Sequence, residues 1–265
     1  MTGIFRWFVL ASLASVVARA VEAPITSLAF APDGQSVLAS SQAGVVWYSW
    51  PELELKKRFE VEMLNVRSLS FSTDGRYLAI GGGNPAENGN VEIYEWPSMI
   101  FSKRIGVHED SVSDVCWLGS SRILSASLDR SIKAWSLSSD SPSQEYQGHS
   151  KSVSAICLLN DGKTFVSAGV DQSLRVWNND TGELIRSLNQ HTGPINALAL
   201  RPPVGGLPMV ASAAGDRTIR FWQPTIGRMM RYVRIDSEPL DIAWISESQI
   251  VASCVDSQAR VVDTD

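Results

Sequence analysis

Each of the three histidines in this 265-residue chain is followed by a serine, an aspartate and a tryptophan at nearly constant spacing. The aspartate comes four residues after the serine, and the tryptophan six residues after the aspartate. The three sets are His108, Ser125, Asp129 and Trp135; His149, Ser167, Asp171 and Trp177; and His191, Ser212, Asp216 and Trp222. Serine, histidine and aspartate can together form a hydrolase triad, in which the histidine takes the proton of the serine nucleophile.

Three copies of one trio, at one phase of a repeat, favour a structural role over catalysis. A serine nucleophile often stands in an exposed Gly-x-Ser-x-Gly turn, and the sequence contains no such turn. We therefore predict that these twelve residues are structural and that the chain has no catalytic residues. A propeller hydrolase is kept as an alternative for which no catalytic constellation is evident.

The elements that must position these sets recur roughly every 41–46 residues. Six segments begin with a similar short strand, at residues 25–30, 66–71, 112–117, 153–158, 195–200 and 240–244. An Asp-Gly turn follows several of them, as at Asp33-Gly34, and a strand of small residues comes next. A third strand then ends in an aromatic residue, which is Tyr48, Tyr94, Trp135, Trp177 or Trp222. Short strands without a helical period predict an all-β architecture.

This pattern resembles the WD-repeat β-propeller family, in which each repeat supplies four short strands. The resemblance covers residues 25–265, and Gly148-His149 and Gln190-His191 occupy the Gly-His position of the family. The Trp-Asp position is occupied by Trp135-Ser136, Trp177-Asn178 and Trp222-Gln223. The resemblance implies a propeller of four-stranded antiparallel blades, with six repeats counted and a seventh blade not evident. It also implies a buried chain in which the indole donates to the serine, the serine to the histidine and the histidine to the aspartate.

The outer repeats depart from this pattern. Val21, Glu62 and Asp236 occupy the histidine position, and the sixth repeat has Ala252 for the serine and Val262 for the tryptophan. We therefore expect the middle of the chain to be the more rigid part. Residues 81–90, rich in Gly and Asn, are predicted to be an inserted loop and are a weak candidate for a contact site.

The second residue of each predicted first strand is a candidate for binding a partner. These residues are Thr26, Arg67, Ser113, Ser154, Asn196 and Asp241. The family resemblance places this position near the upper mouth of the central channel. A mixed polar ring, with Arg67 and Asp241 as its only charges, would suit a peptide with hydrogen-bonding groups better than a polyanion. The alternative is that these are solvated positions without a partner.

Residues 1–20 fit two incompatible roles. An early arginine, an apolar run over residues 7–18 and the small residues of Ala18-Arg19-Ala20 predict a secretory signal peptide cleaved after Ala20. The protein would then be exported, either to a periplasm or out of the cell. The alternative is that residues 14–18 supply the fourth strand that the last repeat lacks and so close the propeller of a cytoplasmic protein.

The composition narrows the classes of function. With 23 Lys and Arg against 28 Asp and Glu, the net charge is −5, and without a basic block we expect no nucleic-acid partner. The sequence contains no run of 18 apolar residues, so no integral membrane segment is predicted. The three cysteines form no Cys-x-x-Cys motif, so neither a metal nor a cofactor is expected. The resemblance therefore implies a non-enzymatic scaffold that binds a protein or peptide, with a structural module of a larger assembly as the alternative.

Overall fold

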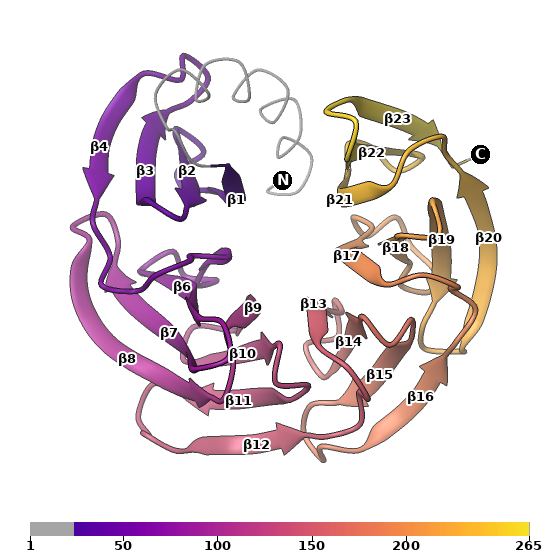
Figure 1. Ribbon diagram of the computed structural model, residues 1–265, viewed down its shortest axis with the longest axis horizontal. Coiled ribbons are helices and arrows are strands. Elements are labelled where there is room, and N and C mark those ends of the chain that lie inside the picture. The colour runs from indigo at the N-terminus through magenta and orange to yellow at the C-terminus, as the bar shows by residue number, and fades with distance from the viewer. Residues whose placement is uncertain (1–23, 265) are drawn as a thin grey trace. The chain divides into compact units, whose positions relative to one another are not determined.

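The computed structural model describes residues 24–264, and this part of the chain consists of β-strands and connecting turns without any helix. The strands form six antiparallel sheets, of which five have four strands and one has three. Every sheet is a meander in which consecutive strands are neighbours (Figure 1). The protein is therefore an all-β β-propeller with six blades, which confirms the predicted fold class. Residues 24–264 contain no seventh sheet.

Contacts divide the chain into two compact units, residues 24–147 and residues 148–264. The first unit holds blades 1 to 3. Blade 1 comprises β1 (Ile25–Phe30), β2 (Ser36–Ser41), β3 (Gly44–Ser49) and β4 (Leu55–Phe59). Blade 2 comprises β5 (Ser68–Phe71), β6 (Tyr77–Asn84), β7 (Asn88–Glu95) and β8 (Ile100–His108). Blade 3 comprises β9 (Val112–Leu118), β10 (Arg122–Ser127), β11 (Ile132–Ser136) and β12 (Pro142–Tyr146).

The second unit holds blades 4 to 6. Blade 4 comprises β13 (Val153–Leu158), β14 (Thr164–Gly169), β15 (Leu174–Asn178) and β16 (Leu184–Leu188). Blade 5 comprises β17 (Ile195–Leu200), β18 (Val210–Ala214), β19 (Thr218–Gln223) and β20 (Arg228–Arg234). Blade 6 comprises β21 (Pro239–Trp244), β22 (Gln249–Cys254) and β23 (Ala259–Asp263).

The Asp-Gly pairs make the turns between first and second strands, as their sequence predicts. Gly34, Gly75 and Gly162 have φ angles of +68°, +71° and +66°, a region that residues with a Cβ rarely adopt. The Asp33 carboxylate accepts the main-chain N–H of Gln35 at 2.8 Å and so holds its turn closed. These turns fix where each second strand begins.

Residues 81–90 form a regular hairpin, so their prediction as an inserted loop is wrong. β6 and β7 pair as far as Gly83 with Gly89 and Asn84 with Asn88. The Gly- and Asn-rich composition is typical of loops, but here small residues are needed because other main-chain atoms approach closely. A Cβ on Gly89 would lie 2.2 Å from the carbonyl oxygen of Asp110.

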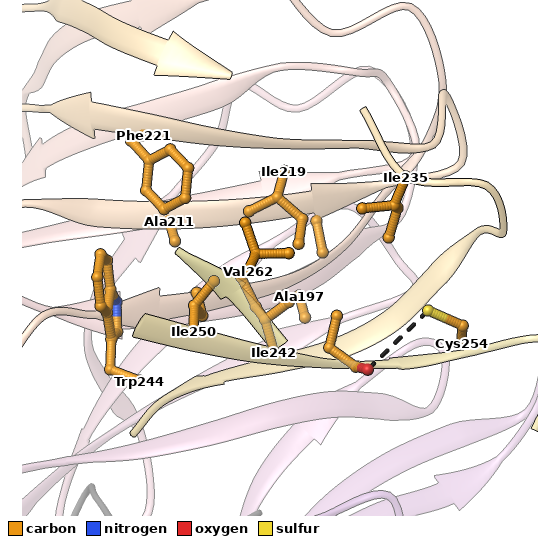
Figure 2. Packing of buried hydrophobic residues seen from close by; sticks show 12 residues of the cluster. Ala197, Ala211, Ile219, Phe221, Ile235, Ile242, Trp244, Ile250, Cys254 and Val262 are labelled. Carbon is orange, nitrogen blue, oxygen red and sulfur yellow. Dashed lines mark hydrogen bonds between the residues drawn. The ribbon is translucent and has the colours of Figure 1, made fainter. Parts of the chain in front are cut away.

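The hydrophobic core consists of layers between neighbouring blades of the same unit. Small second-strand residues and larger third-strand residues of one blade face the first and second strands of the next. Figure 2 shows one such layer, in which Phe221 and Ile219 of blade 5 pack with Trp244, Ile242 and Ile250 of blade 6. Burial of this kind contributes about 25 cal/mol per Å² of apolar surface. The alternation of small and large residues in the sequence thus gives each blade two apolar faces.

Within residues 24–264, β23 is the last strand of blade 6 and pairs only with β22. The described residues thus supply three strands to blade 6. The predicted signal peptide and its alternative as a closing strand, residues 1–20, lie outside the described residues.

Candidate functional site

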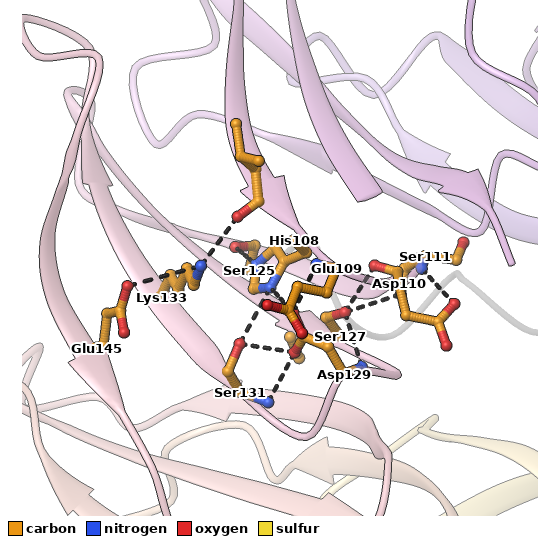
Figure 3. A network of polar contacts seen from close by, with 12 residues as sticks. His108, Glu109, Asp110, Ser111, Ser125, Ser127, Asp129, Ser131, Lys133 and Glu145 are labelled. Atoms are coloured by element: carbon orange, nitrogen blue, oxygen red, sulfur yellow. Dashed lines mark hydrogen bonds and ion pairs between the residues drawn. The ribbon is translucent and has the colours of Figure 1, made fainter. Parts of the chain in front are cut away.

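The first of the three repeated sets forms a hydrogen-bonded chain that joins the end of β8 in blade 2 to blade 3. The Trp135 indole N–H donates to Ser125 Oγ at 2.8 Å, and Ser125 Oγ lies 2.7 Å from His108 Nε2. The other ring nitrogen, Nδ1, lies 2.8 Å from Oδ2 of Asp129. His108 ends β8, Ser125 lies on β10 and Asp129 lies in the turn before β11 (Figure 3). The chain thus links four separate elements.

Blades 4 and 5 repeat this geometry almost atom for atom. The indole-to-serine distance is 2.8 Å in both blades, for Trp177 with Ser167 and for Trp222 with Ser212. The serine Oγ lies 2.7 Å from the histidine Nε2 in both blades. The distances from histidine Nδ1 to Asp171 and Asp216 are 3.0 and 2.9 Å. Four residue types in the same order, with a histidine-to-serine spacing of 17–21 residues, therefore produce one arrangement three times. We call each set a tetrad.

A fifth side chain, not singled out from the sequence, holds the aspartate of each tetrad. It lies two residues after the aspartate, and its hydroxyl donates to Oδ1: Ser131 at 2.6 Å, Ser173 at 2.7 Å and Thr218 at 2.6 Å. The main-chain N–H that follows the histidine donates to the same carboxylate at 3.0–3.1 Å. The repeated Asp-x-Ser/Thr sequence is the signal that would have revealed this contact.

These donors shift the acidity of the tetrads. Burial alone would raise the pKa of Asp129, but hydrogen bonds from His108 and Ser131 outweigh it and hold the pKa well below its usual range. The same balance lowers the pKa of Asp171. It lowers the pKa of Asp216 to about 2, with Thr218 as the largest contributor after burial. Burial lowers the pKa of His191 against the opposing effect of Asp216, so this ring is neutral at pH 7.

This protonation state fixes the direction of every hydrogen bond in the chain of blade 5. The neutral His191 ring carries its proton on Nδ1 and donates it to Asp216, since an ionised carboxylate only accepts. Nε2 therefore accepts the Ser212 hydroxyl proton, and the Ser212 oxygen accepts the indole N–H of Trp222. Ser125, Ser167 and Ser212 are 0% exposed. Since a substrate must touch its nucleophile, this arrangement is suited to cross-linking a blade rather than to hydrolysis.

Blade 2 has a different polar interior. The histidine position counted from the sequence holds Glu62, whose side chain is 84% exposed. Instead Met63 is buried beside Gly82, much as the His149 ring lies beside Gly169 in blade 4. The buried position is therefore occupied by Met63, the apolar neighbour of Glu62. The assignment of Glu62 from the sequence is wrong by one residue.

A network of charged groups stands in blade 2 on the outer strands β7 and β8. The Tyr94 hydroxyl donates to Glu92 at 2.8 Å, and the Arg104 guanidinium lies 2.7 Å from Glu92 and 2.8 Å from Glu62. Glu92 is 1% exposed, so Arg104 is the cation that compensates a buried carboxylate. Burial and the contact with Glu92 raise the pKa of Tyr94, which keeps its hydroxyl protonated. A pocket of about 240 Å³ lies beside Glu62, Asn84 and Arg104.

A sequence model described as "WD domain, G-beta repeat" matches three stretches of the chain, residues 101–136, 140–178 and 182–223. Each stretch ends one residue after the tryptophan of a tetrad. The three matches coincide with the three central blades that carry the repeated hydrogen-bonded chains. Blades 3 to 5 are therefore built from WD repeats.

This WD-repeat chain is also similar in sequence to several longer proteins. It is 27% identical over 201 residues to "Protein FIZZY-RELATED 3" of Arabidopsis thaliana, an alignment that covers 75% of this chain and 40% of the relative. "Cell division cycle 20.1, cofactor of APC complex" of the same plant is 26% identical, with 71% and 42% covered. "Telomerase protein component 1" of Rattus norvegicus is 28% identical over 81% of this chain and 9% of the relative. The chain thus spans less than half the length of these relatives.

The six candidate binding residues of this WD-repeat chain lie at the start of the first strands, and three of them bond to the next blade. Thr26 Oγ1 donates to the carbonyl oxygen of Val66 at 2.6 Å. The Asn196 amide donates to the carbonyl oxygen of Pro239 at 2.9 Å, and the Ser154 hydroxyl donates to that of Ile195. These bonds give the three residues a structural task, whatever else they bind.

The other three candidates differ from one another. The Ser113 hydroxyl donates to the Ala126 carbonyl within blade 3, and the Asp241 carboxylate accepts the N–H of Ile242. Arg67 is half-buried, and its Nε is fully buried without a hydrogen-bond partner among residues 24–264. A buried guanidinium nitrogen of this kind lacks the partner that it normally has. The binding role of all six positions stays a prediction.

Residues 24–264 contain no group of three or more His, Cys, Asp or Glu side chains placed to hold a metal ion. Over the same residues, no helix is long and apolar enough to span a membrane.

Proposed function

We propose that this WD-repeat propeller is a non-enzymatic scaffold that binds a protein or peptide. The observation that carries the proposal is the burial of all three Ser-His-Asp trios, whose serines are 0% exposed and accept a tryptophan N–H at 2.8 Å. The residues best suited to covalent chemistry thus serve the interior of the blades. What remains for function is the surface.

The names of the relatives support binding to proteins. One relative carries the words "cofactor of APC complex", and we carry over to this chain only the general idea of a component that acts through other proteins. Since the chain spans 42% of that relative, the identity of its partner does not transfer. A polyanion is disfavoured as the partner by the net charge of −5.

Arg67 is the candidate contact that the structure supports best. Its side chain is half-buried on blade 2 and forms no ion pair with a described residue, while its Nε lacks an acceptor. A carboxylate or carbonyl oxygen of a peptide would supply that acceptor, and a charge-assisted bond to arginine contributes about 1.5–3 kcal/mol. On blade 6, Asp241 is exposed and would take the complementary role toward a peptide donor.

Affinity capture from the native organism tests this proposal. The tagged full chain, an Arg67→Ala variant, an Asp241→Ala variant and an Arg122→Ala control, altered on an exposed arginine of β10, would be compared by quantitative mass spectrometry. We expect partners that are retained by the wild type and the control and depleted about tenfold by Arg67→Ala. Stoichiometric capture that no variant changes would favour a structural module of a larger assembly. Hydrolysis of ester or peptide substrates that is lost in Ser167→Ala would contradict the non-enzymatic assignment.

We further propose that residues 1–20 are a signal peptide and that the protein is exported. The support is the sequence alone, since this segment lies outside the described residues. Amino-terminal sequencing of the protein purified from its native source decides the question. A mature start at Val21 is expected, and an intact Met1 would contradict export and favour the closing strand in a cytoplasmic protein.

A further inference from the structure

A pocket of about 240 Å³ opens on blade 2 beside the buried carboxylate of Glu92. Its walls come from residues 62–64, which precede β5, from the hairpin end of β6 and β7, and from Arg104 on β8. Pockets for small molecules usually have about 300–1,000 Å³, whereas a water molecule takes up about 30 Å³. The pocket is thus small for a metabolite and large enough for one long side chain of a partner.

Three residues that line the pocket stand at positions that hold a tetrad in blades 3 to 5. Met63 takes the place of the histidine. Asn88 stands six residues before the third-strand aromatic Tyr94, which is the distance of each tetrad aspartate from its tryptophan. Asn90 stands four residues before Tyr94, which is the distance of the hydroxyl that holds each aspartate. Blade 2 therefore has neutral amides and a pocket where the other blades have a carboxylate bonded to a histidine.

The blades that contain a tetrad also place a cation beside it, on the third strand. Two residues before the tryptophan, these strands carry Lys133, Arg175 and Arg220. Arg220 lies 3.6 Å from the aspartate of its tetrad, and Lys133 Nζ donates to the carbonyl oxygen of Val107 at 2.9 Å. The same position in blade 2 holds Glu92, a residue of opposite charge. The third strand of blade 2 thus supplies no basic group.

The charged groups that line the pocket leave one carboxylate without full compensation. Arg104 is held by Glu92, since its Nε and Nη2 lie 3.2 and 2.7 Å from the same carboxylate oxygen. The Glu62 carboxylate lies 2.8 Å from the same guanidinium, but its side chain is 84% exposed. Two carboxylates and one guanidinium give the lining a net charge of about −1 at neutral pH. An anion would have to displace Glu62 and approach Glu92, whereas a cation is attracted by both.

The other lining residues suit a guanidinium on an alkyl stem. Asn84, Asn88 and Asn90 each have an amide oxygen that can accept a hydrogen bond. A guanidinium has five N–H donors in a fixed plane and a lysine ammonium has three, so arginine can engage several of these oxygens together with Glu62. Leu64 also lines the pocket and is 60% exposed, which provides apolar surface for the methylene groups of such a side chain.

We propose that the pocket of blade 2 binds an arginine side chain of a partner protein or peptide. The guanidinium would bond to the Glu62 carboxylate and to the asparagine oxygens, and its methylene groups would cover Leu64. The guest would thus supply the basic group that the third strand supplies in blades 3 to 5. The proposal rests on the proposed function in that it assigns a protein ligand, but it uses neither Arg67 nor Asp241.

A minimal probe tests the site. N-acetyl-arginine N-methylamide would be titrated into the full chain labelled with nitrogen-15, and the side-chain amide signals of Asn84, Asn88 and Asn90 would be followed by NMR. We expect saturable shifts of these three signals. The citrulline analogue of the probe has nearly the same shape without the charge, and we expect it to bind at least tenfold more weakly.

Variants of exposed residues assign the binding to the pocket. Glu62→Lys places a cation at its mouth and should weaken binding of the arginine probe at least tenfold. The matched control Glu60→Lys makes the same change two residues earlier, at an exposed position that does not line the pocket, and should bind as the wild type does. Arg67→Ala should also leave binding of the probe unchanged. Circular dichroism would verify that each variant is folded.

Three results would overturn the proposal: no saturable shift of the asparagine signals, equal binding of the citrulline analogue, or equal loss in Glu60→Lys. If the probe fails while capture through Arg67 persists, the pocket is not an arginine site and the proposed function stands. If the probe binds while Arg67-dependent capture of partners is absent, the reverse holds.

Discussion

Blades 4 and 2 have the same four-stranded meander but stabilise its interior by different chemistry. Blade 4 uses a chain of directed hydrogen bonds from Trp177 through Ser167 and His149 to Asp171. Blade 2 uses a buried carboxylate, Glu92, held by Arg104 and Tyr94. Two different sets of residues can therefore satisfy the polar groups buried inside the same meander. Each blade has its own sensitivity to pH and substitution.

Acid should produce the largest difference in stability between the blades that contain tetrads and blade 2. The aspartates of the three tetrads have a lowered pKa in the folded protein, about 2 for Asp216, against about 3.9 for an unfolded chain. Their stabilisation is complete above the unfolded value and is lost as the pH falls from about 4 toward 2. A shift of this size contributes about 2–3 kcal/mol per carboxyl group. Three such groups would then lower the free energy of unfolding by about 6 kcal/mol.

The lowered pKa of His191 adds to this loss at milder pH. Its neutral form is favoured in the folded protein, so its contribution is complete above about pH 6.5 and declines as the pH falls below that value. Urea unfolding at pH 7, 5, 4, 3 and 2 would measure the loss, and Asp216→Asn should flatten the curve. A free energy of unfolding that is constant from pH 7 to pH 3 would contradict this prediction.

Substitution of the buried residue at the histidine position should cost more stability in blade 4 than in blade 2. His149→Leu leaves Ser167 and Asp171 buried without their partner, which is expected to lower the free energy of unfolding by about 3 kcal/mol. Met63→Leu, at the corresponding place in blade 2, conserves volume and should cost less than about 1.5 kcal/mol. Chemical denaturation measures both values. Equal losses would show that the tetrad is no more important than ordinary packing.

Within blade 2, the buried member of the charged network should matter more than the exposed one. Glu92→Gln leaves Arg104 without its buried counter-charge and is expected to cost about 2 kcal/mol. Glu62→Gln removes an exposed carboxylate from the same arginine, and a change of at most about 0.5 kcal/mol is expected. If the exposed substitution proved the more damaging, Arg104 would depend on Glu62 instead.

Hydrogen exchange should show a smaller difference, between the middle of the chain and its last blade. Blade 6 has no tetrad, and β23 pairs on one side only among the described strands. We expect amide protons of β22 and β23 to exchange about tenfold faster than those of β14 and β15, a difference of about 1.4 kcal/mol in opening free energy. Similar protection in the two blades would contradict the greater rigidity predicted for the middle of the chain.

The tetrad residues could be predicted from the sequence, because each position in the hydrogen-bonded chain requires one residue type at a nearly constant spacing. The repeat also gave the six blades, since Asp-Gly turns and third-strand aromatics mark the strands. The network of Glu92, Arg104 and Tyr94 was not found, because it depends on the pairing of two strands whose register shifts at a bulge between Ile93 and Tyr94. A charged residue between the apolar Val91 and Ile93 was the available signal.

Two further limits of the sequence have physical causes. The buried position of blade 2 is filled by Met63 rather than Glu62, since counting along the chain does not reveal which neighbour turns inward. The hydrogen bonds of Thr26, Ser154 and Asn196 to the next blade depend on the distance between strands far apart in sequence. Their polar character indicated a surface for binding, while the structure also gives them partners within the protein.

The bonds from these three first-strand residues end on main-chain carbonyl groups, and this has a consequence for how the repeats can diverge. An acceptor in the backbone persists whatever side chain evolution places at Val66, Ile195 or Pro239. The repeats can therefore drift widely in residue type while neighbouring blades stay joined. A shift of one residue along a first strand, by contrast, would move the carbonyl out of reach. The chain should therefore tolerate substitutions at these positions but not insertions within a first strand.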